Sequence, residues 1–364
     1  MPKPLYPGAI PNRAPASWRD LAGQAAPAHA PGDGRVLLPA ALPGQRIHFG
    51  SGSARLAAYV SGPKVRGSIP GVTPMLLVHS VNAAASAAEV RPIYERAAVT
   101  RPVMALELPG FGSSNRDGLQ YHPQLMSDAI LAAAHEFRLR GFQGPVDLLA
   151  VSLSCEFAAR AALAKPELFR SVSLVSPTGL ESRHLERYES GLTKEKPWLR
   201  SVLERGPWSE ALFRLLTSEP SMRMFLKRTW GSRNIDETLL AYNLLSVKAH
   251  GARHAPYAFI AGSLFTRGAA HLYEQLNLPV WVAHGVRGDF AKFDGLKTVQ
   301  RTSAWIVDSF DTGAMPYFEV PGPFMDRLER FLGEVASSAS TASPDSEAQQ
   351  TSFAGRAGHS AGVR

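Results

Sequence analysis

The chain has 364 residues, of which 45% are hydrophobic and 19% are charged. This balance is typical of a folded globular protein and excludes a chain that is disordered throughout. The formal net charge is +8, but the basic residues are mostly dispersed and no nucleic-acid-binding motif accompanies them, so we expect no nucleic-acid partner.

Cysteine content and hydropathy limit the chemistry and the compartment. The single cysteine, Cys155, cannot form an intramolecular disulfide or a multi-cysteine zinc site. No run of about 18 apolar residues predicts an integral membrane span. Because the N-terminus lacks the basic-then-apolar pattern of a signal peptide, we expect a cytoplasmic protein. No metal-ligand spacing, glycine-rich phosphate loop or covalent cofactor motif occurs, so we expect neither a metal nor a cofactor.

Both ends of the chain predict irregular structure. Residues 1–45 contain nine prolines, and proline at this density prevents regular helix or sheet, so we expect an extended arm. Residues 337–364 are rich in Ser, Ala and Gly with little apolar content, which predicts a disordered tail. The length leaves room between them for one large domain with an insertion or for two smaller domains.

Strand and helix patterns alternate from residue 46 onward. Residues 46–49 and 55–61, joined by Gly50-Ser51-Gly52, predict a β-hairpin at a sheet edge. Short apolar runs then predict strands at 75–78, 103–106, 146–151 and 172–175, separated by an Ala-rich segment at 83–98 and helices at 124–140 and 153–164. This alternation favours an α/β protein with a doubly wound, mostly parallel sheet that is buried on both faces.

Residues 180–273 interrupt this alternation. They show helical periodicity, three tryptophans and several prolines, but no buried strand. We expect an inserted helical cap over the carboxyl ends of the strands, where open α/β sheets bind ligands. Strand patterns return at 280–283 and 304–307, and a helix pattern closes the fold at 324–332. The predicted core therefore comprises residues 46–179 and 274–336.

One short stretch has the pattern of a nucleophile elbow. The strand at 146–151 leads into Ser152 and then directly into an Ala-rich helix. Such a turn holds its serine in a strained backbone conformation and requires small residues two positions before and after it. Ala150 and Ser154 occupy those positions here in place of two glycines.

These features resemble the α/β-hydrolases with a helical cap, over roughly residues 46–335. Four stretches carry the resemblance. Leu76-Leu77-Val78-His79-Ser80 resembles the family's His-Gly oxyanion segment, and Glu107-Leu108-Pro109-Gly110-Phe111-Gly112-Ser113-Ser114 resembles its acidic-x-Pro-Gly-x-Gly-x-Ser turn. Residues 148–155 resemble its nucleophile elbow, and residues 280–289 resemble the strand and loop that present its acid. Their order and spacing predict the α/β-hydrolase fold.

The resemblance implies acyl transfer on a small-molecule substrate. In this family a serine attacks a carbonyl, a histidine removes the serine proton, an acid orients the histidine and two backbone amides hold the oxyanion. Carried over by position, Ser152 is the nucleophile, Asp289 is the acid, and the amides of Val81 and Leu153 form the oxyanion hole.

The sequence departs from the family at the histidine. The family's Gly-His-x-Pro-x-x-Glu reads Gly313-Ala314-Met315-Pro316-Tyr317-Phe318-Glu319, so alanine stands where the base is expected. No histidine occurs between His284 and His359, which excludes a small shift within this loop. The acid Asp289 also comes one residue later than usual, and Gly288 before it allows a bulge that absorbs the extra residue. Ser80 replaces the oxyanion-segment glycine, where its side chain either crowds the substrate or adds a hydrogen bond.

Other residues are alternatives for the missing roles. His254 and His284 are candidates for a relocated base, although each is more simply explained as a core or surface histidine. His79 is expected to brace the oxyanion loop, as the family uses that position. Glu181, just after the strand at 172–175, is a second candidate acid. Cys155 lies about one helical turn beyond Ser152 and is expected to be a small packing residue.

Three functions fit this pattern. The first is a serine hydrolase of a carboxylic ester, lactone or related acyl group with an atypical or incomplete triad. The second is a ligand-binding or scaffold protein that has kept the pocket and lost hydrolysis. The third is a lyase or isomerase that uses Asp289 or Tyr317 in the same pocket. The retained elbow favours an enzyme, whereas the missing histidine favours a binding protein.

The densest basic stretch lies inside the predicted cap. Residues 223–233 contain four basic residues interleaved with Met, Phe, Leu and Trp. This pattern fits a face for a membrane surface or an acidic ligand, but a solvated helix face above an apolar stripe explains it more simply.

Overall fold

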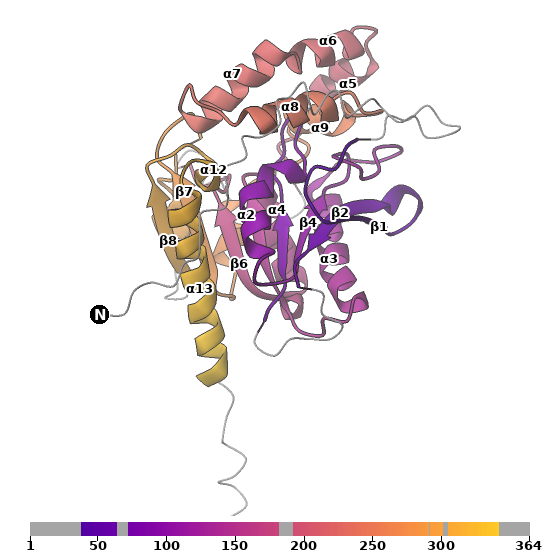
Figure 1. The fold of residues 1–364 in the computed structure, drawn as a ribbon. Coiled ribbons are helices and arrows are strands. Elements are labelled where there is room, and N and C mark those ends of the chain that lie inside the picture. The colour runs from indigo at the N-terminus through magenta and orange to yellow at the C-terminus, as the bar shows by residue number, and fades with distance from the viewer. Residues whose placement is uncertain (1–37, 64–71, 182–191, 291, 301–304, 342–364) are drawn as a thin grey trace, which may run out of the picture.

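A single eight-stranded sheet forms the centre of the computed structural model, which describes residues 38–63, 72–181, 192–290, 292–300 and 305–341 (Figure 1). The strand order is β1-β2-β4-β3-β5-β6-β7-β8. The strands are β1 (Gln45–Phe49), β2 (Leu56–Ser61), β3 (Met75–Val78), β4 (Val103–Glu107), β5 (Val146–Val151), β6 (Phe169–Val175), β7 (Val280–Gly285) and β8 (Trp305–Phe310).

The strand directions confirm the predicted doubly wound sheet. β1 and β2 form the predicted antiparallel hairpin, and β2 also runs antiparallel to β4. The other neighbours are parallel: β4 with β3, β3 with β5, and onward through β8. All residues of β3, β4 and β5 are buried, as expected for strands covered by helices on both faces.

The helices that follow the strands lie close to their predicted positions. The α-helices are α2 (Arg91–Ala97), α3 (Pro123–Leu139), α4 (Ser154–Ala164), α5 (Pro197–Arg205), α6 (Ser209–Leu216), α7 (Glu219–Trp230), α8 (Glu237–Ser246), α9 (His254–Ile260), α10 (Ala270–Glu274), α11 (Leu296–Val299), α12 (Pro316–Glu319) and α13 (Pro321–Thr341). The short 3-10 helices are η1 (Gly52–Ala54), η2 (Ala87–Val90) and η3 (Pro166–Leu168).

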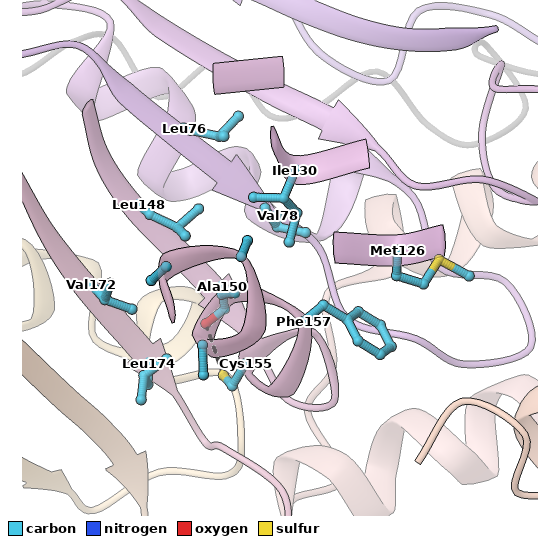
Figure 2. Packing of buried hydrophobic residues seen from close by; sticks show 14 of the residues in the cluster. Leu76, Val78, Met126, Ile130, Leu148, Ala150, Cys155, Phe157, Val172 and Leu174 are labelled. Carbon is cyan, nitrogen blue, oxygen red and sulfur yellow. Dashed lines mark hydrogen bonds between the residues drawn. The ribbon is translucent and has the colours of Figure 1, made fainter. Parts of the chain in front are cut away.

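The strand side chains alternate between two cores, one on each face of the sheet. Leu76, Val78, Leu148 and Ala150 belong to the core that packs against α3 and α4 (Figure 2). Their sequence neighbours, such as Leu77, belong to the opposite core with α2, α12 and α13. Because strand side chains alternate, a continuous apolar run fills both cores at once.

Cys155 is a buried packing residue, as predicted. It is fully buried at the start of α4, and its Sγ donates to the Ala150 carbonyl oxygen at 3.3 Å (Figure 2). Burial raises the pKa of this thiol well above its ordinary value, so the neutral thiol is the favoured form.

Helices α5 to α9 lie between β6 and β7 in the sequence and gather at one end of the sheet (Figure 1). We call them the helical insertion. It contacts the loops that follow two of the strands: the Ala314 amide donates to the Thr229 carbonyl at 2.9 Å, and the Ser246 hydroxyl donates to the Ala84 carbonyl at 3.2 Å. Since these loops follow β8 and β3, the insertion covers the carboxyl ends of the strands.

The two predicted terminal segments fall largely outside the described residues. Residues 38–44 precede β1, and within them Leu38, Ala41 and Leu42 are buried. α13 continues to Thr341, so the predicted tail boundary at 337 falls inside this helix.

Candidate active site

The turn at Ser152 has the backbone geometry of a nucleophile elbow. Ser152 joins β5 to α4 with φ of 56°, in the left-handed region that non-glycine residues rarely adopt. Among the described residues, only Ser176 (φ 47°) is a second non-glycine residue with positive φ. The Ser152 amide donates to the Val175 carbonyl at 2.8 Å, which fixes the turn against the end of β6. Backbone strain of this kind persists only where its surroundings enforce it.

The two small residues beside Ser152 are both fully buried. Ala150 leaves room for the turn, and Ser154 also makes a contact that the sequence pattern did not predict. The Ser154 hydroxyl donates to the His79 carbonyl at 2.6 Å. This bond ties the first turn of α4 to the loop after β3, which carries the predicted second oxyanion amide.

The two predicted oxyanion amides have no acceptor within the described parts of the chain. Val81 and Leu153 are both buried, and no hydrogen bond from either backbone N–H occurs there. Leu153 is the N-cap of α4, where backbone N–H groups lack intrahelical partners. Amides held in this way are available to stabilise an oxyanion.

His79 braces the loop after β3, as predicted from its position. Its Nε2 accepts a hydrogen bond from the Leu108 amide at 3.1 Å, so the proton lies on Nδ1, which donates to the Ser80 carbonyl at 2.6 Å. Burial lowers the pKa of the His79 imidazole to about 4, and the bond to Ser80 partly opposes this shift. The ring is therefore neutral near neutral pH.

Protonation of His79 should destabilise the fold in acid. The pKa of His79 is lower in the folded state than in the unfolded chain. Between pH 6.5 and about 4 the unfolded chain therefore binds more protons than the folded state, and the free energy of unfolding decreases as the pH is lowered. The loss approaches about 3 kcal/mol at full protonation. Chemical unfolding of the wild type and of His79→Gln tests this: the stability advantage of the wild type should shrink from pH 7 to pH 4.5. An unchanged difference would contradict it.

A buried carboxylate holds the same loop from the other side. The Ser80 amide donates to Glu89 Oε2 at 2.9 Å, and Asn82 Nδ2 donates to Glu89 Oε1 at 2.5 Å and to Ser80 Oγ at 3.0 Å. The Ser80 side chain therefore gains a hydrogen bond. Burial raises the pKa of Glu89, and the bonds from Ser80 and Asn82 oppose the shift. Glu89 and Asn82 were not predicted; the only sequence signal was two polar residues in an Ala-rich stretch.

Ala314 is linked to the elbow through Ser176 and Val175 at the end of β6. It stands between β8 and α12, and its carbonyl accepts a hydrogen bond from the Ser176 hydroxyl at 2.8 Å. Ser176 directly follows Val175, whose carbonyl binds the Ser152 amide. The Ala314 methyl group thus lies in the loop from which the resemblance expects an imidazole. Ser176 was not predicted, and its position just after β6 was the only signal.

Glu319 and Gly313, from the stretch that resembles the histidine motif, are in contact. Glu319 accepts hydrogen bonds from the Gly313 amide at 2.7 Å and from Arg287 Nη2 at 2.5 Å. A Cβ atom at Gly285 would lie 1.9 Å from the Gly313 oxygen, so the two loops pack too closely for any side chain there. Glu319 and the close packing at Gly285 therefore hold the loop that carries Ala314.

Asp289 lies at the surface in an ion pair. Its Oδ2 is 3.0 Å from Nε of Arg228 on α7, and the two side chains are 55% and 64% exposed. Gly288 has φ of 85°, in the left-handed region that favours glycine, and a Cβ atom there would lie 2.6 Å from the Arg228 oxygen. Among the residues that the structure describes, no histidine is hydrogen bonded to this carboxylate.

The two alternative histidines lie at the start of α9 and at the end of β7. His254 begins α9, and burial followed by the charge of Arg253 lowers its pKa. His284 ends β7, where Nδ1 lies 3.0 Å from the Gly285 oxygen and the ring lies 4.4 Å from that of Phe293. Within the described ranges, neither ring is hydrogen bonded to the Ser152 hydroxyl, and no other side chain is.

Tyr317 and Glu181 are the two remaining candidates. Tyr317 is fully buried, and its hydroxyl has no hydrogen-bond partner among the described residues. Burial raises its pKa well above the ordinary value. Glu181 is the last described residue before the segment 182–191.

An apolar cavity of about 220 Å³ reaches the loop after β3 from the helical insertion. A cavity of about 150 Å³ with an apolar lining is large enough to bind benzene, so this one has room for a ring or a short chain. Its lining consists of Asn82, Ala83, Phe213, Leu216, Ser221, Met222, Met224, Phe225, Arg228, Pro256, Phe259 and Ile260.

Neither metal binding nor membrane insertion is indicated by the described residues. No group of three or more His, Cys, Asp or Glu side chains there is placed to hold a metal ion. No helix in the same parts of the chain has both the length and the hydropathy to cross a membrane.

Comparison with known proteins gives a match only in structure. Neither a protein-family model nor a curated protein matches the sequence. A probable hydrolytic enzyme from Pseudomonas aeruginosa PAO1 superimposes with a TM-score of 0.61 at 18% identity, covering 81% of this chain and 96% of that one. 2-Hydroxy-6-oxo-6-phenylhexa-2,4-dienoate hydrolase from Rhodococcus sp. strain RHA1 gives 0.60 at 17% identity, covering 79% and 98%.

A third similar structure has a different named activity. The Cif epoxide hydrolase from Acinetobacter nosocomialis gives a TM-score of 0.59 at 15% identity, covering 86% of this chain and 94% of that one. Identities this low establish the fold and leave the reaction open. With its strand order and its strained serine turn, this chain has the α/β-hydrolase fold.

Proposed function

We propose that the protein is a serine hydrolase of a carboxylic ester, lactone or related acyl substrate, with Ser152 as nucleophile. The observation that carries this proposal is the strained φ of 56° at Ser152 beside two amides, from Val81 and Leu153, that donate no hydrogen bond within the described residues. In the same proposal, residues 180–273 form a cap over a core of residues 46–179 and 274–336, and the protein acts in the cytoplasm.

The proposed reaction begins with a bond between Ser152 Oγ and the acyl carbon. The carbonyl oxygen becomes an oxyanion, which the amides of Val81 and Leu153 stabilise, and the alcohol leaves as the acyl-enzyme forms. An apolar acyl group fits the cavity beside Ala83. The serine proton has no histidine acceptor among the described residues, so it passes through solvent to the leaving alcohol. Water then hydrolyses the acyl-enzyme, which releases the carboxylic acid and restores the Ser152 hydroxyl. We expect slow turnover in which the oxyanion hole and substrate positioning supply the acceleration.

A fluorophosphonate probe should label Ser152 and no other residue. Attack by Oγ on phosphorus releases fluoride and places a phosphonyl oxygen near the two amides. Mass spectrometry of the labelled protein checks the position. Ser152→Ala should abolish labelling, whereas Ser127→Ala, which removes another buried serine from α3, should leave it unchanged. A wild-type protein that stays unlabelled would contradict the proposed hydrolase.

A ligand-binding protein is the second candidate, and Ala314 is the observation that favours it. Without a base, the same amides and cavity would hold a carboxylate ligand and leave it unchanged. In that case hexanoate should raise the melting temperature of the protein, Ser152→Ala should retain this effect, and the fluorophosphonate should not react.

A further inference from the structure

Exposed apolar residues are concentrated on the outer helices of the insertion. The described residues include eleven large hydrophobic side chains that are exposed, and five of them lie between residues 197 and 230. These five are Trp198, Val202, Trp208, Leu215 and Met224. Helices α5, α6 and α7 belong to the part of the insertion that lies beyond the end of the sheet (Figure 1).

Each of the three outer helices places apolar and basic residues on the same exposed stripe. On α5 the stripe is Trp198, Val202 and Arg205, at spacings of four and seven residues. On α6 it is Ala211, Arg214 and Leu215, and on α7 it is Pro220, Met224, Lys227 and Arg228. These spacings put the residues of each set on one helix face. We call the three stripes, together with the exposed Trp208 at the N-cap of α6, the outer cap face.

The charge of this region is strongly positive. Residues 192–233 contain nine basic and four acidic residues, a net charge of +5 out of +8 for the whole chain. Arg223 and Arg228 are in ion pairs, with Glu219 and Glu237 and with Asp289. Arg205, Arg214 and Lys227 make no ion pair with any residue in the described ranges. Their charges are therefore available to an anionic partner.

The outer cap face also leads toward the candidate active site. An open groove of about 760 Å³ follows α7 between Pro220 and Arg233 and includes Arg223 and Lys227. Met224 and Arg228 line both this groove and the apolar cavity, which ends at Asn82 and Ala83. A hydrocarbon chain that enters beside Met224 thus has an apolar path toward the loop of Val81.

We propose that the outer cap face docks on an anionic phospholipid membrane surface. Exposed tryptophans suit the membrane–water interface because their rings are amphipathic, and basic residues are attracted to anionic headgroups. The mixed stripes distinguish this face from a purely solvated one, and its charge fits an anionic lipid. The docking does not depend on whether Ser152 is activated.

Vesicle binding tests the proposal with the full-length protein. It should bind vesicles of phosphatidylcholine mixed with phosphatidylserine, and bind vesicles of phosphatidylcholine alone more weakly. The tryptophan fluorescence should shift to shorter wavelength on binding. In a Trp18→Phe background, Trp198→Phe/Trp208→Phe should lose this shift, because the three remaining tryptophans, Trp230, Trp281 and Trp305, are buried. Ser152→Ala should bind like the wild type, which separates this test from that of the hydrolase.

Charge reversal gives the matched comparison. Each basic residue near an anionic membrane surface strengthens binding about fivefold, so Arg214→Glu/Lys227→Glu should weaken binding at least about 25-fold. Arg96→Glu/Arg330→Glu changes the net charge equally on exposed parts of α2 and α13 and should bind like the wild type. Added salt should weaken wild-type binding, a measurement that needs no variant.

Three results would overturn the proposal. One is failure of the wild type to bind the phosphatidylserine vesicles at low salt. Another is equal loss of binding in the two charge-reversal variants. The third is self-association through this face together with no vesicle binding. Light scattering without lipid would then show an oligomer, and Leu215→Ser would convert this oligomer to a monomer.

Discussion

Replacing Ala314 with histidine should raise the rate at which a fluorophosphonate labels Ser152 by about 100-fold, since a positioned general base contributes roughly 10²–10⁴. The new imidazole would extend from the loop that Ser176 and Thr229 hold beside β6 and α7. Quenching the labelling reaction at successive times and measuring the labelled fraction by mass spectrometry gives the rate constant. Hydrolysis of a soluble short-chain ester should increase in parallel.

The control for this gain is a histidine placed elsewhere at the same site. Ala83→His adds an imidazole to the loop after β3, where the resemblance predicts no base, and should leave the labelling rate within a few-fold of wild type. Equal gains from both variants would show an unspecific effect. No gain from Ala314→His would mean that the site lacks more than one residue. Asp289, held by Arg228, is then the next residue to test, by adding Arg228→Met.

Removing Asp147 should cost about 3–5 kcal/mol of stability, because it leaves two arginines without their counter-charge in a mostly buried place. Asp147 lies in β5 and is 1% exposed. Arg170 donates to both of its carboxylate oxygens, at 2.9 and 2.6 Å, and Ser171 donates to Oδ1 at 2.7 Å. Arg101 lies 3.4 Å from Oδ2. Urea unfolding of Asp147→Ala measures the loss.

An exposed ion pair provides the contrast. Arg223 bonds Glu237 on the surface of the insertion, where Glu237 is 61% exposed. Solvent weakens such pairs, so Glu237→Ala should cost less than about 1 kcal/mol. If the two variants lost similar stability, the burial of Asp147 would not be the reason for its effect.

Sequence patterns located most of the fold because those patterns are local. Strand residues such as Leu76, Leu77 and Val78 are contiguous in the chain, and their alternate side chains fill the two cores. The elbow is equally local: Ala150, Ser152 and Ser154 lie within five residues, so the strained turn could be predicted from them.

The contacts that support the site join residues far apart in sequence. In the sequence, Asp147 is a single polar residue within an apolar run. Only the pairing of β5 with β6 brings Arg170 next to it. Likewise, Glu89 accepts a hydrogen bond from the Ser80 amide only because η2 packs against the loop after β3. Nothing in the spacing of these residues predicts such pairs.

The sequence alone determined the order of the strands along the chain, the position of Ser152 and the absence of a histidine at Ala314. These follow from short-range patterns, whose physical basis is the alternation of strand side chains and the steric demand of one turn. Only the tertiary structure decided that Asp289 pairs with Arg228 and that the insertion exposes Trp198 and Met224. Helical periodicity assigns residues to faces, but packing against the rest of the fold decides which face meets solvent.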